Sequence, residues 1–129
     1  MLYQIQSQKP VEEIERDLQE SAARNQFGIL AVHDLKQTMK TKNVDLAMEC
    51  RIYEVCNPQQ AKRVLEVDGA VSTALPCRIS LYGSRGNYTL ATMLPTEMMK
   101  AFDRPELAPI AEEVEKVIVR IMQDAAGSE

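Results

Sequence analysis

The chain of 129 residues contains no tryptophan, one histidine, two phenylalanines and four tyrosines. A surface that stacks bases and follows phosphates needs aromatic side chains and clustered cations, but here the lysines and arginines are scattered along the chain. Acidic residues outnumber basic ones by 19 to 15, which gives a formal net charge of -4. We therefore expect no nucleic-acid partner.

Long hydrophobic runs are also missing. No apolar stretch approaches the roughly 20 residues that a helix needs to cross a bilayer. The N-terminal segment, M-L-Y-Q-I-Q-S-Q-K-P, lacks the charged and then apolar pattern of a signal peptide. We therefore expect a cytoplasmic protein with no membrane partner, whose three cysteines stay reduced, and their odd number argues further against a disulfide framework.

Recognisable catalytic and metal-binding motifs are absent as well. The sequence has no Ser–His–Asp order, no H-E-x-x-H, no Gly-rich phosphate loop and no C-x-x-C. Cys50 and Cys56 lie about 20 Å apart in an extended strand at ~3.3 Å per residue, too far to share one metal ion. We predict no metal site, name no cofactor, and leave open whether the protein is an enzyme.

The apolar residues that are present, 45% of the chain, follow strand and helix periods over residues 1–129, which we interpret as a single domain. Strands are predicted at 2–7, 29–32, 50–56, 77–82 and 88–92, and helices at 10–25, 34–40, 58–68, 96–102 and from 107 onward. The order β-α-β, short α, β-α-β-β, α-α predicts a two-layer α+β fold, with a mixed β-sheet of about five strands and helices packed on one face. The two β-α-β units are most simply right-handed crossovers between parallel strands, and the apolar run at 29–32 is typical of a strand covered on both faces.

Cys56 is the strongest candidate for a functional residue. It ends a predicted strand and precedes Asn57 and Pro58, which suit the N-cap and first position of a helix. The free N–H groups of a helix N-terminus stabilise a thiolate or a bound anion. Free cysteines are also often small buried hydrophobes, so both interpretations stay open for Cys56, whereas packing is preferred for Cys77.

Two further candidates lie at strand positions. His33 ends a predicted strand, where it is suited to act as a general base or ligand, although a half-exposed structural histidine is the preferred interpretation. Arg78 falls on the outward face of its strand, beside Tyr82. Helices on one face leave the other face of the sheet partly bare, so we expect a homodimer, with Ile, Tyr and Leu side chains of the 77–90 hairpin in contact.

Residues 54–82, E-V-C-N-P-Q-Q-A-K-R-V-L-E-V-D-G-A-V-S-T-A-L-P-C-R-I-S-L-Y, resemble the family known as domain of unknown function 302. The resemblance extends over about 27–95, and the pairing of C-N-P with L-P-C-R at this separation is specific. It implies a compact α+β homodimer without an established reaction, and some relatives are encoded among bacterial sulfur-metabolism proteins. The motif positions carried over, with no role attached, are Cys56, Asn57, Pro58, Pro76, Cys77 and Arg78.

Three functions follow as hypotheses. The first is a small homodimeric protein that binds a small molecule or serves sulfur metabolism, with its site at Cys56 and with Asn57, Cys77, Arg78 and His33 as further candidates. The second is a thiol enzyme or a sulfur carrier in which Cys56 holds a persulfide. The third is a regulatory interaction module without a ligand site.

Overall fold

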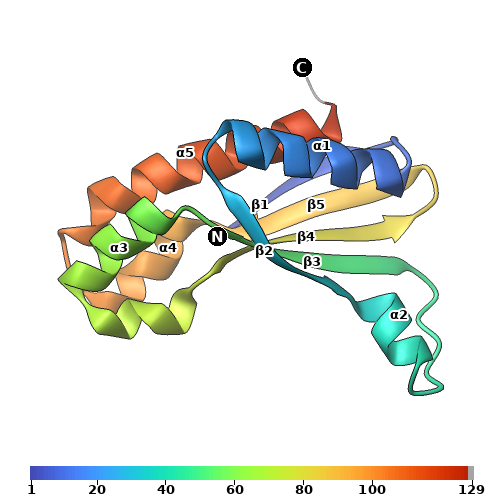
Figure 1. Cartoon of the computed structure of the whole chain (residues 1–129), viewed down its shortest axis with the longest axis horizontal. Helices are drawn as coiled ribbons and strands as arrows, with labels where there is room; N and C mark the ends of the chain where they lie inside the picture. Colours follow the sequence, from blue (N-terminus) through green and yellow to red (C-terminus); the bar gives the residue numbers. More distant parts are fainter. Residues whose placement is uncertain (128–129) are drawn as a thin grey trace.

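The computed structural model describes residues 1–127, and its elements follow the predicted order (Figure 1). The strands are β1 (Leu2–Ser7), β2 (Gly28–Asp34), β3 (Glu49–Cys56), β4 (Cys77–Ser84) and β5 (Asn87–Met93). The α-helices are α1 (Val11–Arg24), α2 (Leu35–Lys40), α3 (Pro58–Val67), α4 (Pro95–Met99) and α5 (Leu107–Ala126). Two short 3-10 helices, η1 (Gly69–Ala74) and η2 (Lys100–Phe102), follow α3 and α4.

The five strands form one sheet in the order β1-β5-β4-β3-β2, and every neighbouring pair is antiparallel. The prediction of a mixed sheet with parallel crossovers is therefore wrong. β1 and β2 do run in the same direction, but they form the two edges of the sheet with three strands between them. α3 and η1 join two neighbouring antiparallel strands, and a strand–helix–strand pattern alone does not distinguish such a connection from a parallel crossover.

Helices α1 and α5 cover one face of the sheet, as predicted, so the fold is a two-layer α+β structure (Figure 1). Alternate strand residues such as Tyr53 and Ile79 point into this layer and are completely buried. They pack with Ile14, Leu18 and Ile118 from the two helices. We call this set the main core.

A second apolar cluster lies beyond the end of the sheet, where α3 and α4 gather beside α5 (Figure 1). We call it the end cluster, and its buried members are Val64, Val71, Met99, Leu107, Ile110 and Ala111. The N-terminal half of α5 packs in the end cluster and its C-terminal half packs on the sheet. Within residues 1–127, no helix combines the length and the apolar character needed to cross a membrane.

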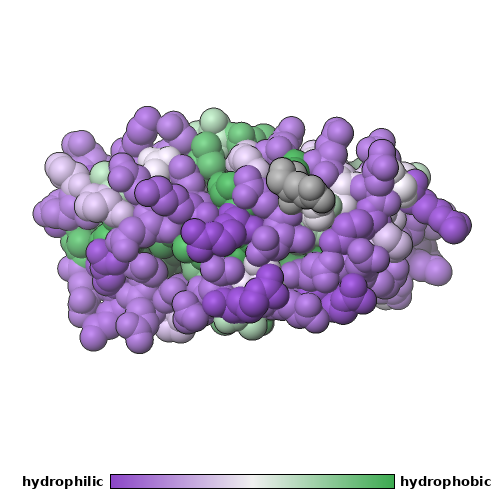
Figure 2. Space-filling view, turned by 90° about the horizontal axis from the view of Figure 1, so that it is seen from above, coloured by the Kyte–Doolittle hydropathy of each residue, from purple (hydrophilic) through white to green (hydrophobic). Residues whose placement is uncertain are grey.

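The face of the sheet opposite α1 and α5, here the open face, carries Arg78 and Tyr82 as predicted. The isoleucine and leucine side chains of the hairpin were expected to supply contact area for a dimer on this face. That prediction is wrong, because Ile79, Leu81 and Leu90 are completely buried in the main core. Looking instead onto the helical layer, Figure 2 shows that hydrophilic side chains cover most of the surface. On this side, α1 and α5 lie over the sheet (Figure 1).

Strand β2 also differs from its prediction. It is an edge strand rather than one covered on both faces, and its side chains Leu30 and Val32 are 61% and 42% exposed. A β-bulge between Ile29 and Ala31 shifts the register of the strand, as is common at sheet edges. A short apolar run does not show whether a strand lies at the centre or at the edge of a sheet, so the sequence pattern could not predict the position of β2.

Helix α3 begins as the sequence predicts. The Asn57 side-chain oxygen accepts hydrogen bonds from the backbone N–H groups of Gln59 (3.0 Å) and Gln60 (3.2 Å). Pro58 occupies the first turn, where its fixed φ favours the helix and its missing N–H costs nothing. This cap fixes the start of α3 directly after the end of β3.

We predict that Asn57→Ala lowers the free energy of unfolding by about 1 kcal/mol, because alanine supplies no acceptor for the two N–H groups. Urea unfolding followed by circular dichroism measures the loss. Gln59→Ala is the matched control, since Gln59 is exposed and contributes only its backbone to the cap. An Asn57→Ala protein as stable as the control would contradict the role of the cap.

Candidate functional site

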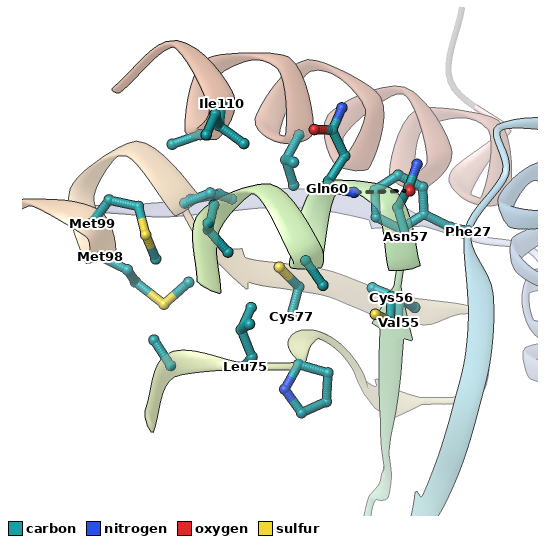
Figure 3. Close-up of a pocket in the computed structure, with 17 residues that line it drawn as sticks. Phe27, Val55, Cys56, Asn57, Gln60, Leu75, Cys77, Met98, Met99 and Ile110 are labelled. Carbon is teal, nitrogen blue, oxygen red and sulfur yellow. Dashed lines mark hydrogen bonds between the residues drawn. The ribbon is translucent and has the colours of Figure 1, made fainter. Parts of the chain in front are cut away.

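A cavity of about 50 Å³ lies between the main core and the end cluster, inside a wider hollow of about 530 Å³ that includes its mouth (Figure 3). It forms where β3 and β4 stop pairing. Val55 and Cys77 are the last partners in their ladder, after which the chain turns into α3 on one side and arrives through Pro76 on the other. Helices α4 and α5 close the space from the opposite side.

The lining of the cavity is almost wholly apolar. Its polar side chains are the amides of Asn57 and Gln60 and the thiols of Cys56 and Cys77, and within the described part of the chain no charged side chain lines it. The remaining lining residues are Phe27, Val55, Ala61, Val64, Ala74, Leu75, Pro76, Pro95, Met98, Met99, Ile110, Ala111 and Val114. Such a surface favours an uncharged apolar occupant over an anion or a hydrated cation.

The fold brings Cys56 and Cys77 to the same cavity from neighbouring strands, and neither is in a disulfide. Burial, and to a smaller extent repulsion from the nearby Cys56, together raise the pKa of the Cys77 thiol from 9.0 to about 11. Burial also raises the pKa of Cys56. Both groups are therefore neutral thiols near neutral pH, which makes them poor nucleophiles.

The N-terminus of α3 does not offer free N–H groups to Cys56, contrary to the hypothesis drawn from the sequence. Pro58 has no N–H, and the N–H groups of Gln59 and Gln60 donate to the Asn57 side chain. The Ala61 N–H donates to the Asn57 carbonyl oxygen at 2.9 Å. The same Asn57 that caps the helix thus uses the donors that an anion or a thiolate would need.

The other predicted site residues lie elsewhere. His33 is on the open face with its ring Nε2 3.0 Å from a Glu54 carboxylate oxygen, and its side chain is 48% exposed, the degree of exposure that was expected. Arg78 reaches the same carboxylate at 3.9 Å. Cys50 lies at the far end of β3, where burial and then Asp34 raise its pKa. The cavity therefore unites Cys56, Asn57 and Cys77 but neither His33 nor Arg78.

Sequence reasoning missed the helical half of the site. Met98 and Met99 from α4 and Ile110 from α5 line the cavity opposite the strand ends. The adjacent methionines are the one signal in the sequence, because methionine fills irregular apolar spaces and is frequent at adaptable binding surfaces. Among residues 1–127, no group of three or more His, Cys, Asp or Glu side chains is arranged to hold a metal ion.

Comparison with known proteins places this fold among proteins without a described activity. Residues 3–125 match the family described as "Domain of unknown function DUF302". The chain is also similar to the crystal structure of an uncharacterized conserved protein DUF302 from Bacillus stearothermophilus, with 28% sequence identity and a TM-score of 0.90. The similarity covers 96% of this chain and 97% of that one. None of the curated proteins compared with the chain matches it.

We predict that Cys77 makes the fold less stable in alkali. The unfolded thiol ionises near pH 9.0 and the folded one near 11, so its stabilising effect is complete below pH 9 and is lost as the pH rises through that interval. The loss amounts to about 2–3 kcal/mol, at 1.36 kcal/mol for each pKa unit. Urea unfolding of the wild type at several pH values measures it.

Two variants isolate the contribution of Cys77 from those of lysine and tyrosine. Cys77→Ala removes the thiol, so its stability should decline less steeply between pH 9 and 11 than that of the wild type. Cys50→Ala should keep most of the wild-type slope, because Cys50 lies outside the cavity. Equal slopes in the wild type and Cys77→Ala would show that the Cys77 thiol is not buried as described.

Proposed function

Because the chain belongs to the DUF302 family, whose description names no activity, we propose a function from the cavity itself. We propose that the protein is a binding protein that takes a small, uncharged, apolar molecule into the space beside Cys56. The observation that carries this proposal is the lining, in which apolar side chains from strands and helices surround the space and none of the described lining residues is charged. A charged ligand would find no opposite charge in this lining, so the site favours an uncharged one.

The volume of the cavity limits the size of the ligand. An engineered apolar cavity of about 150 Å³ stays dry and binds benzene or xenon. At about 50 Å³, the present cavity suits a single xenon atom or the methyl end of a longer molecule. The rest of such a molecule would lie in the wider hollow of about 530 Å³ around the cavity.

The thiol chemistry supports binding over catalysis. A thiol enzyme or persulfide carrier needs a reactive thiolate, but burial raises the pKa of both Cys56 and Cys77. Among the described residues that line the cavity there is also no base that could take the proton, since His33 lies on the open face beside Glu54. We therefore favour a binding protein over a sulfur carrier that uses Cys56.

We further propose that the protein acts as a cytoplasmic homodimer joined through the open face. Leu2 and Met93 are register partners on this face and are 55% and 48% exposed, which provides apolar area. Glu54 and Arg78 lie on the same face, so two copies related by a two-fold axis can place opposite charges together. Three unpaired cysteines support a reducing compartment such as the cytoplasm.

We expect xenon under pressure to shift the ε-methyl NMR signals of Met98 and Met99 in protein labelled with ¹³C-methionine, because both side chains line the cavity. Met122 is buried in the main core and Met93 is exposed, so their signals serve as internal controls. Saturable shifts confined to Met98 and Met99 would support the binding site. Shifts of similar size at all four methionines would contradict it.

Filling the cavity tests the same site by a second route. Ala61→Leu adds side-chain volume to the lining from α3, so xenon should no longer shift the Met98 and Met99 signals. Ala23→Leu is the matched control, because Ala23 is exposed on α1 and its helix keeps a good helix former. Unchanged xenon binding in Ala61→Leu would place the xenon elsewhere.

For the assembly, we predict a dimer in sedimentation equilibrium at micromolar concentration, and a monomer for Met93→Lys, which places a charge on the open face. Leu65→Lys is the control, since Leu65 is exposed on α3, away from the sheet. A wild-type protein that sediments as a monomer would refute the dimer. Dissociation by Leu65→Lys but not by Met93→Lys would move the interface to the helical end.

A further inference from the structure

Four sulfur atoms line the cavity, and they come from three elements of the fold. Cys56 ends β3, Cys77 begins β4, and Met98 and Met99 belong to α4. Figure 3 shows the two methionine side chains on one side of the space, with Cys77 and Cys56 toward the strand ends. We propose that this arrangement is a binding site for a soft monovalent metal ion of the Cu(I) class.

The donor atoms select the metal. Thiolate and thioether sulfur bind Cu(I) in preference to the hard cations, which need carboxylate, carbonyl or water oxygen. No carboxylate and no imidazole lines the cavity within the described residues, so magnesium, calcium and zinc lack their usual ligands there. The spacing along the strand excluded a metal ion shared by Cys50 and Cys56. It does not apply to Cys56 and Cys77, the two cysteines that the fold brings to one cavity.

The charge of the complex also fits the cavity. On binding, one thiol releases its proton to solvent and its sulfur forms a bond to the ion, Cys–SH + Cu⁺ → Cys–S–Cu + H⁺, with no change in oxidation state. The product is neutral, and the thioethers of Met98 and Met99 add donors without adding charge. A neutral complex is the form that an apolar space without countercharges accepts at the lowest cost.

The surrounding structure holds these donors in place. The backbone ladder fixes Cys77 opposite Val55, and the Asn57 cap fixes the start of α3 next to Cys56. Met99 is buried in the end cluster, so its side chain is confined by packing. A dry apolar shell of this kind controls the access of water and oxidants to a bound metal.

This inference uses the same cavity as the proposed function but rests on its sulfur atoms rather than on its volume. Xenon binding therefore tests the space, and metal binding tests the donors. A protein that takes xenon but not Cu(I) would refute the metal site alone. A protein that takes Cu(I) at these sulfurs but not xenon would leave the metal site standing.

The test is an anaerobic titration of the reduced full chain with Cu(I), with bicinchoninate as a coloured competitor. We expect one ion per chain in the wild type and in Cys50→Ala, because Cys50 lies outside the cavity. Cys77→Ala should weaken binding by at least about tenfold, the loss seen even when groups that only support a metal ligand are removed. Equal weakening in Cys50→Ala and Cys77→Ala would overturn the assignment.

The thioethers are tested separately. Met98→Leu combined with Met99→Leu nearly conserves side-chain volume, so the protein should stay folded while its Cu(I) affinity declines. In ¹³C-methionine protein, the redox-inert ion Ag(I) should shift the Met98 and Met99 methyl signals and leave those of Met122 and Met93 unchanged. A double variant with wild-type affinity, or equal Ag(I) shifts at Met122, would remove the methionines from the site.

Discussion

The packing of α5 is the constraint on which the site depends. This helix buries one apolar stripe against two different partners, with Ile118 and Ile121 in the main core and Leu107 and Ile110 in the end cluster. The sheet ends between them, because β3 and β4 stop pairing at Val55 and Cys77. Close packing is hardest to maintain where one partner surface is replaced by another. The cavity lies at that junction, and Ile110, Ala111 and Val114 of α5 line it.

Strand β3 separates two chemical environments along its length. Near its start, Arg51 pairs with Glu15 at 2.9 Å, and the Tyr53 hydroxyl donates to the same carboxylate at 2.6 Å. At its other end, Cys56 meets an apolar space whose lining carries no charge in the described part of the chain. Charges on the helical side of β3 therefore pair with one another away from the cavity, although the buried Nε of Arg51 has no hydrogen-bond partner. Burial in this uncharged space keeps the thiols neutral, and neutral thiols are poor nucleophiles.

Local features could be predicted because their causes are local. The order of the elements follows from apolar periodicity, and the start of α3 follows from Asn57 and Pro58, whose side chains act within one turn. The half-exposed His33 and the outward Arg78 follow from strand alternation. The family resemblance pointed to Cys56 and Cys77, and both line the cavity. The free N–H groups expected beside Cys56 are absent because they donate to the Asn57 side chain. This outcome could have been predicted from the sequence, because Asn57 is a good cap and Pro58 has no N–H group.

The sequence by itself determined the periods, the capped turn and the two-layer α+β class, since each depends on neighbours within a few positions of the chain. The tertiary structure decided what depends on distant segments. Strand direction was one such feature, because a helical connection fits either an antiparallel return or a parallel crossover. The exposure of β2 was another, because an apolar run does not record whether it lies at an edge. The cavity was a third, because Met98, Met99 and Cys77 line one space only after α5 has joined the two apolar clusters.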